Sequence, residues 1–159
     1  MKIRLASPHD KPALTEILND IIAIGGTTAY EDPLAPAYFD RLVEADDPKT
    51  FLHVAEAEGE IVGFQWMEPF DPPDDHIGGI ATFARPGTTQ RGIGSALFEV
   101  TKSASRAAGY AEIEAKIRAD NSGGLAYYTR MGFEDRFVTT GVPLKDGTPV
   151  DRVHKRLIL

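Results

Sequence analysis

A glycine-rich segment, residues 86–95, has the residue types and spacing of a site for a phosphate group. It reads Pro-Gly-Thr-Thr-Gln-Arg-Gly-Ile-Gly-Ser, follows an apolar extended stretch and opens an amphipathic helix that ends at Gly109. The first N–H groups of a helix have no partner within the helix, and they lie at the positive end of its dipole. The segment therefore predicts that an anionic group binds at the start of this helix.

Two common phosphate-binding loops do not fit this segment. The dinucleotide fingerprint Gly-x-Gly-x-x-Gly requires a glycine where this chain has Leu97, and the P-loop requires a Gly-Lys-Ser/Thr sequence that the segment lacks. What remains is a pair of glycines, Gly92 and Gly94, with Pro86 six residues before the first of them. Such a pair is compatible with a structural turn as well as with a ligand site, so a second motif has to decide.

The second motif runs from Asn121 to Phe133 and reads Asn-x-x-Gly-Leu-x-x-Tyr-x-x-x-Gly-Phe. Together the two segments resemble the Gcn5-related N-acetyltransferase (GNAT) family, with its pyrophosphate loop Q/R-x-x-G-x-G/A and its later motif N-x-x-A-[IL]-x-x-Y-x-x-x-G-F. Two positions depart from the family: Thr89 replaces its Gln or Arg, and Gly124 replaces its alanine. The resemblance is firm over residues 50 to 135 and is loosely similar to the branch that acetylates amino acids and phosphinothricin-like analogues.

The resemblance implies acetyl-CoA as the cosubstrate. In the family the strand before the glycine loop pairs through its backbone with the pantetheine arm, like an added strand, and the loop holds the diphosphate. A backbone N–H near Phe83 would then stabilise charge on the thioester carbonyl oxygen. The residues implied in cofactor binding are Thr82, Phe83, Ala84, Gln90, Arg91, Gly92, Ile93, Gly94, Ser95 and Asn121.

Tyr128 matches the family tyrosine whose hydroxyl lies near the thioester sulfur, and the resemblance implies that it protonates the departing thiolate. The neighbouring Tyr127 is expected to fill the core with its hydroxyl satisfied. Only the register against Gly132 and Phe133 separates the two tyrosines. Asn121 is expected to cap the following helix and, by resemblance, to reach the pantetheine amides; capping alone is the alternative.

A general base for the acceptor amine is not evident in the sequence. Relatives that acetylate amino-acid-like amines often use a glutamate on the strand before the loop, where this chain has Gly79. His76 is the candidate base, because the ordinary histidine pKa of about 6.5 suits proton transfer near neutral pH. His154 is expected at the surface, and no side-chain cluster has the spacing of a metal site. Acidic neighbours that could act directly or through water are Glu68, Asp71, Asp74 and Asp75.

The acceptor is expected to lie beside the segment Thr27–Pro33, which joins the first two predicted helices. In the GNAT family this segment usually helps to form the wall of the acceptor pocket, so the resemblance implies substrate contacts by Thr28, Tyr30 and Glu31. A pocket closed by the segment would favour a small molecule. An open groove would favour a protein N-terminus or lysine.

By resemblance, the chain is expected to be an N-acetyltransferase that acts on the primary amine of a small molecule, with an amino acid or analogue favoured. The chain has no cysteine, so acyl transfer has to be direct or pass through some other residue, and direct attack by the amine in a ternary complex is the expected route. Acetylation of a protein N-terminus or lysine is one alternative. A catalytically silent acyl-CoA-binding module that regulates a partner is the other alternative. The candidate proton donor Tyr128 argues against a silent module, whereas Gly79, at the position of the usual glutamate base, argues for it.

The charge balance narrows the expected partners. The 159 residues carry a formal net charge of −7, which argues against nucleic-acid binding because that requires a cationic face. The acidic balance mildly favours a cationic amine, although solubility alone explains it as well. The sequence shows neither a signal-peptide pattern nor an apolar stretch of about 18 residues, so a cytoplasmic protein outside the membrane is expected. A homodimer is left open as its assembly.

The order of the predicted elements indicates an α+β fold with a mixed sheet in one domain, residues 1–159. The resemblance implies the GNAT fold, in which the central sheet is mainly antiparallel and helices cover both faces. The first helix is expected to begin after Ser7, with Asp10 completing a capping box, and to end at Gly25. A second helix is expected from Asp32, and Gly78-Gly79 indicates a bulge or a close backbone approach. Strands are expected at residues 51–56, 61–67, 76–84, 111–118, 133–140 and 150–158, with the proline-containing residues 68–75 as an exposed loop.

Overall fold

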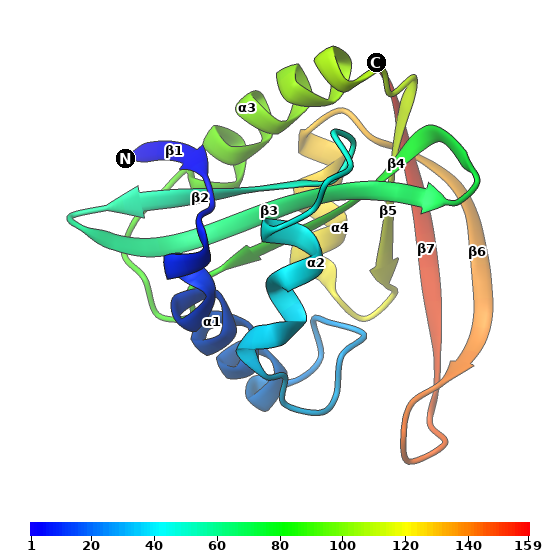
Figure 1. Ribbon diagram of the computed structural model, residues 1–159. Coiled ribbons are helices and arrows are strands. Elements are labelled where there is room, and N and C mark those ends of the chain that lie inside the picture. The colour runs from blue at the N-terminus through cyan, green and yellow to red at the C-terminus, as the bar shows by residue number, and fades with distance from the viewer.

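One seven-stranded sheet runs through the protein. The computed structural model describes residues 1–159, and its strands lie in the order β1-β2-β3-β4-β5-β7-β6 (Figure 1). Only β4 and β5 run parallel, and every other neighbouring pair is antiparallel, so the predicted α+β class with a mixed, mainly antiparallel sheet is confirmed. The elements are β1 Lys2–Leu5, α1 Lys11–Ile24, α2 Asp40–Val43, β2 Phe51–Ala57, β3 Glu60–Asp71, β4 Asp74–Ala84, α3 Ile93–Ala108, β5 Glu112–Arg118, α4 Ser122–Arg130, β6 Glu134–Pro143 and β7 Pro149–Ile158.

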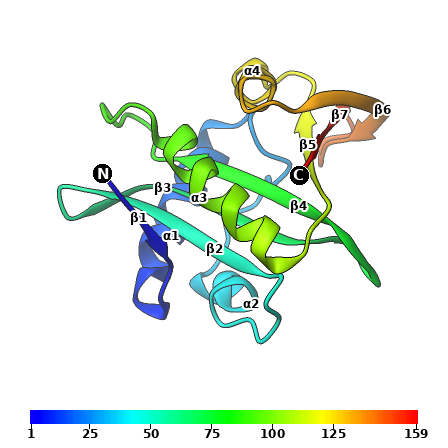
Figure 2. The same ribbon diagram turned by 90° about the horizontal axis from the view of Figure 1, so that it is seen from above.

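Helices cover both faces of the sheet (Figure 1 and Figure 2). On one face α1 and α2 pack in a core cluster that contains Phe39, Phe64 and Trp66. On the other face α3 and α4 pack around Met67 and Phe98. Trp66 and Met67 are neighbours on β3 but belong to different clusters, because successive side chains of a strand point to opposite faces. None of the helices has the length and apolar character needed to cross a membrane.

The start and end of α1 follow the sequence signals. A 3₁₀ turn, Pro8–Asp10, precedes the helix, and the Asp10 carboxylate accepts a hydrogen bond from the Ser7 backbone N–H at 2.7 Å. Arg4 on β1 donates two further hydrogen bonds to this carboxylate, at 2.8 and 3.0 Å. The same carboxylate therefore ties the first strand to the start of the helix, which ends at Gly25 as predicted.

The second helix begins later than predicted and is shorter. No helical residues follow Asp32 directly; a 3₁₀ turn occupies Pro36–Phe39, and α2 is a single turn after it. Pro33 and Pro36 explain the difference, because each lacks a backbone N–H and restricts the residue before it to an extended conformation.

Residues 68–75 form most of a hairpin, and the expectation of an exposed loop is wrong for most of them. β3 continues to Asp71 and β4 begins at Asp74, so only a tight turn separates the two strands. Pro69 is accommodated at the point where the register of the pair shifts, between Pro69 and Asp71. Proline is tolerated in a sheet at such irregular positions because no regular ladder bond is lost there.

β5 has the predicted alternation of apolar and polar residues, but its polar face is also covered. Ile113 and Ala115 point into the core, while Glu114 on the opposite face is only 1% exposed. The Glu114 carboxylate accepts hydrogen bonds from Arg156 on β7 and lies 3.3 Å from His154 Nδ1. His154 is buried and is not the surface group expected from the sequence, because β7 is inserted between β5 and β6.

Candidate active site

β4 and β5 separate part-way along their length. They pair only through Ile77–Gly79 and Glu112–Glu114, so residues 80–84 of β4 have no strand partner on that side. Pairing with β3 stays regular there, so Gly78-Gly79 makes no bulge; instead Gly78 lies in close contact with the Met67 side chain. The separation leaves one backbone edge of β4 open.

A cavity of about 570 Å³ lies in this opening. β4, β5, α4, the α1–α2 loop and the first turn of α3 all contribute to its wall. The structure thus brings together segments that are up to about 130 residues apart in the sequence. Of the predicted site residues, those that line the cavity are Thr28, Tyr30, Thr82, Phe83, Ala84, Gly94, Asn121 and Tyr128.

Tyr128 is a buried residue that lines this cavity. The hydroxyl oxygen lies 2.8 Å from Thr82 Oγ1, which also accepts a hydrogen bond from Gln65 Nε2 at 2.9 Å. The ring packs edge-on against Phe133, with 5.1 Å between the centroids. Burial raises the pKa of Tyr128 above its ordinary value, so the hydroxyl keeps its proton at neutral pH. Such a group can donate a proton to a departing atom.

Tyr127 also lines the cavity, but both hydrogen-bonding functions of its hydroxyl are used. It donates to the Gly94 carbonyl oxygen at 2.8 Å and accepts from Gln65 Nε2 at 3.1 Å. The ring lies so close to Gly94 that a Cβ atom there would come within 2.5 Å of it. Tyr127 therefore ties α4 to the first turn of α3, whereas the Tyr128 hydroxyl has Thr82 as its single partner.

The glycine loop ends at the N-terminus of α3. Gly92 caps this helix with φ 72°, in the left-handed region that favours glycine. The first helical hydrogen bond runs from the Ala96 N–H to the Gly92 carbonyl oxygen, so the three N–H groups between them have no helical partner. The Ile93 side chain is buried in the core, and only its backbone can contact a ligand. Exposed side chains in this region belong to Gln90, Arg91 and Ser95.

Side chains of β5 and α4 hold the α1–α2 loop in place. Arg118 donates to the Thr28 carbonyl oxygen at 3.1 Å, and Asn121 Nδ2 donates to the Thr27 carbonyl oxygen at 3.1 Å. Asn121 Oδ1 accepts from the Gly124 N–H at 2.9 Å, so its predicted capping role is confirmed. Both polar ends of the Asn121 side chain thus have partners within the protein.

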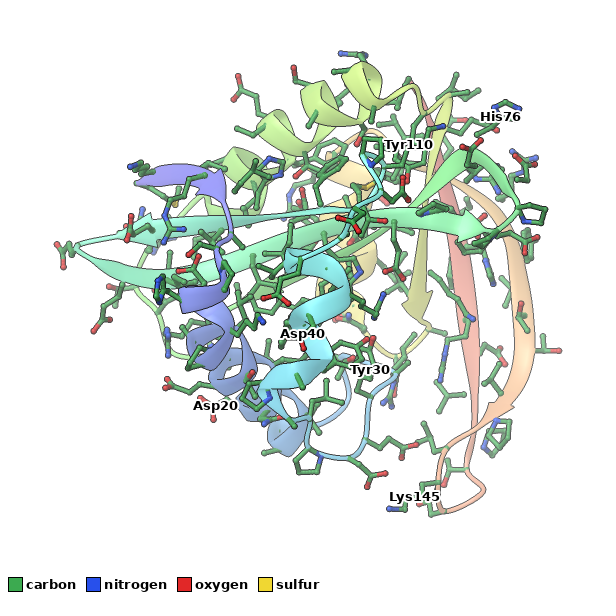
Figure 3. All side chains as sticks on the ribbon, in the orientation of Figure 1. Asp20, Tyr30, Asp40, His76, Tyr110 and Lys145 are labelled. Atoms are coloured by element: carbon green, nitrogen blue, oxygen red, sulfur yellow. The ribbon has the colours of Figure 1, made fainter.

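Tyr30 and Glu31, neighbours on the α1–α2 loop, have different positions. Tyr30 lines the cavity, and its hydroxyl is hydrogen-bonded to that of Tyr38. Glu31 does not line the cavity, because its carboxylate accepts a hydrogen bond from the Lys145 N–H at 2.9 Å. Lys145 lies at the tip of the β6–β7 hairpin, at the same end of the molecule as Tyr30 (Figure 3). Glu31 therefore holds the loop to the hairpin.

His76 is not part of the cavity. It is exposed beside the turn between β3 and β4, far from Tyr30 (Figure 3). Six residues of extended strand separate it from Thr82, a distance of about 20 Å. Glu68 pairs with Arg41 instead of facing the cavity. None of the other carboxylates considered as bases lines the cavity either: Asp71, Asp74 and Asp75 are exposed around the turn.

Sequence reasoning missed three cationic residues on the cavity wall: Lys116 and Arg118 from β5, and Arg152 from β7. The alternation in β5 was a usable signal, because residues two apart on a strand share a face. Nothing comparable pointed to Arg152, since the pairing of β7 with β5 joins segments distant in sequence. No group of three or more His, Asp and Glu side chains is arranged to hold a metal ion.

The sequence profile of the Acetyltransferase (GNAT) family matches residues 13–133. This match covers most of the chain and contains both the glycine loop and the motif that ends at Phe133. The chain therefore belongs to the GNAT family, as its motifs and fold indicated.

Individual relatives agree with this membership. Mycothiol acetyltransferase of Clavibacter sepedonicus is 32% identical over 101 residues, which are 62% of this chain and 32% of that protein, so the chain spans about a third of that relative's length. The ribosomal-protein-alanine N-acetyltransferase of Brucella melitensis has a TM-score of 0.91 at 26% identity, with 100% of both chains covered. A Sinorhizobium meliloti phosphinothricin acetyltransferase in complex with acetyl-CoA has a TM-score of 0.87 at 22% identity, over 99% of this chain and 88% of that one, which shows the shared fold.

Proposed function

We propose that the protein transfers the acetyl group of acetyl-CoA to the primary amine of a small molecule, with both substrates bound at once. The observation that carries this proposal is the opening between β4 and β5 at the N-terminus of α3, with Tyr128 among the residues that line it. Membership of the GNAT family supports the same reaction.

The residues around the opening fit acetyl-CoA. The open backbone edge of β4 at Thr82, Phe83 and Ala84 offers N–H and C=O groups to an arm that contains amides. The free N–H groups at residues 93–95 offer partners to a diphosphate. A cavity of about 570 Å³ has room for the thioester end and a small amine. Acetyl-CoA supplies an acetyl group activated as a thioester.

Acetyl transfer forms a bond between the amine nitrogen and the carbonyl carbon and breaks the carbon–sulfur bond. The sulfur gains a proton, which we assign to the Tyr128 hydroxyl, and solvent restores that proton. A backbone N–H near Phe83 is assigned to the carbonyl oxygen, where negative charge develops. The amine loses its proton to water, since no carboxylate or histidine lines the cavity, and the cationic wall favours the neutral amine.

The α1–α2 loop supports a small acceptor. Its residues Thr27–Tyr30 form part of the cavity wall, and contacts from Arg118, Asn121 and Lys145 hold it in place. A polypeptide acceptor needs an open groove, which a loop fixed in this way restricts. Acetylation of a protein N-terminus or lysine is the alternative, and the Brucella melitensis neighbour is named a ribosomal-protein-alanine N-acetyltransferase.

A thiol-release assay with acetyl-CoA tests the proposal. The panel contains amino acids, polyamines and short peptides, and the Gly92→Glu variant is the control for release at this site. With small amines, we expect the wild type to release thiol faster than acetyl-CoA is hydrolysed without an amine. We expect Gly92→Glu to abolish this release. Release only with peptides would establish the alternative acceptor. No release with any amine, in a protein that binds acetyl-CoA, would establish a silent binding module.

A further inference from the structure

Arg152 is a buried cation that forms no ion pair. The residue is 5% exposed, and its one hydrogen bond runs from Nη1 to the Val150 carbonyl oxygen at 3.4 Å, at the long end of the useful range. A guanidinium has five N–H donors, and burying a charge without partners costs free energy. The buried side-chain atom that lacks a hydrogen bond belongs to Gln65 and not to Arg152, so the Arg152 nitrogens without a partner are accessible to solvent, and Arg152 is one of the residues that line the cavity.

Arg118, the residue opposite Arg152 on the neighbouring strand, brings a second positive charge close to it. Arg118 and Arg152 are directly paired across β5 and β7, and like charges in this position repel each other. Arg118 is neutralised: its Nε and Nη2 donate to the two oxygens of Asp120 at 2.9 and 2.8 Å. Asp120 therefore has its ion pair with Arg118, and Arg152 lies close enough to feel the Asp120 charge but forms no ion pair with it.

Lys116 extends the same positive surface. It is an exposed residue two positions before Arg118 on β5, so it shares that face of the strand, and it lines the cavity without an ion-pair partner. No aspartate or glutamate lines the cavity. Other cations of this part of the sheet do have partners: the buried Lys155 pairs with Asp135, and the largely covered Arg156 pairs with Glu114.

We propose that Arg152, assisted by Lys116, binds the carboxylate of an α-amino acid acceptor and so determines the specificity of the enzyme. This inference rests on the proposed acetyl transfer and names its substrate class. The carboxylate supplies the charge that the cavity wall lacks, and arginine binds a carboxylate through two parallel hydrogen bonds. The bound carboxylate orients the amine a short, fixed distance away.

Paired substrates that differ only in the carboxylate test this subsite. The thiol-release assay is run with a panel of L-amino acids and with the carboxamide of each, for the wild type, Arg152→Met and Arg152→Lys. The wild type is expected to prefer the acids, and Arg152→Met is expected to lower kcat/KM for the acids about 10- to 100-fold, mainly through KM, while the amides change less than about threefold. Arg152→Lys keeps the charge and is expected to retain part of the preference. Lys116→Met is expected to show a smaller loss of the same kind.

Direct binding separates this inference from the proposed reaction. Calorimetry of the same acids and amides with protein saturated with CoA reports the subsite even if no acetyl transfer occurs. Arg136→Met on the exposed part of β6 is the control for removal of a surface charge. CoA binding and the melting temperature of Arg152→Met show whether that variant is folded; if it is not, Arg152→Lys and Lys116→Met carry the test. Equal treatment of acids and amides by the wild type, or an equal loss on both in the variants, would overturn the assignment.

Discussion

The hydroxyl groups of Tyr128 and Thr82 lie 2.8 Å apart and join α4 to β4 on the wall of the cavity. Thr82 is held in turn by Gln65, whose side chain on β3 is fully buried. The partner of the Tyr128 hydroxyl is therefore itself fixed. A proton donor held in this way is oriented before the substrates bind, which reduces the reorganisation needed during reaction.

Replacing Tyr128→Phe removes the hydroxyl and keeps the ring that packs against Phe133. We expect kcat to fall about 100-fold, the lower end of the range for general acid catalysis, because a thiolate is a tolerable leaving group. Binding of acetyl-CoA should be nearly unchanged. Steady-state kinetics measure the first quantity and calorimetry the second.

Tyr127→Phe is the matched control for this substitution. It removes the hydrogen bonds to Gly94 and Gln65, so we expect a loss of about 1 kcal/mol in the free energy of unfolding and kcat within about threefold of the wild type. Equal small losses of kcat at both tyrosines would contradict the role assigned to Tyr128.

Replacing Gly92→Glu tests the diphosphate site. The new side chain brings a negative charge to the N-terminus of α3 and places a non-glycine residue at φ 72°. We expect CoA to bind at least about tenfold more weakly by calorimetry. Thr89→Ala, in the same loop, should change the affinity much less because backbone groups are assigned the contacts. Unchanged CoA affinity in a folded Gly92→Glu protein would exclude the site.

Glu114 should be important for stability although it lies outside the cavity. It is fully buried with Arg156 and His154 as partners, and Glu114→Gln leaves the Arg156 charge with only the longer contact to the more exposed Glu112. We expect a loss of about 3–5 kcal/mol in the free energy of unfolding, measured by urea titration. Glu112→Gln, on the same face but more exposed, should cost less than about 1 kcal/mol. Similar losses for the two variants would show that burial of the ion pair does not decide the effect.

Asp10 should make the protein sensitive to acid. Hydrogen bonds from Arg4 lower the pKa of this carboxyl below its ordinary value of 3.8, so the unfolded chain takes up the proton first as the pH falls. The stabilisation is complete above pH 3.8 and is lost as the pH falls through the lower pKa of the folded state. Asp10→Asn should lose about 1–3 kcal/mol at pH 7 and show a weaker decrease in this acid range. The free energy of unfolding is measured by urea titration at several pH values. The same pH dependence in Asp10→Asn and the wild type would contradict the role assigned to Asp10.

The local features of this protein could be read from its sequence. Ser7, Asp10 and Gly25 mark the limits of the first helical segment, because capping depends on residues a few positions apart. The glycine loop marks the start of α3 for the same reason. The register of the motif that ends at Phe133 singled out Tyr128, and Tyr128 is among the residues that line the cavity. Each of these inferences needs only neighbours along the chain.

Only the tertiary structure decided what surrounds Tyr128. His76 shares β4 with Thr82 but lies at the other end of the strand, and Arg152, 24 residues beyond Tyr128 in the sequence, lines the same cavity. Arg152 reaches the cavity because β7 inserts between β5 and β6, and this also buries Glu114. Strand order and register depend on contacts between segments distant in sequence, whose free energies are shared over the whole sheet and leave no local pattern.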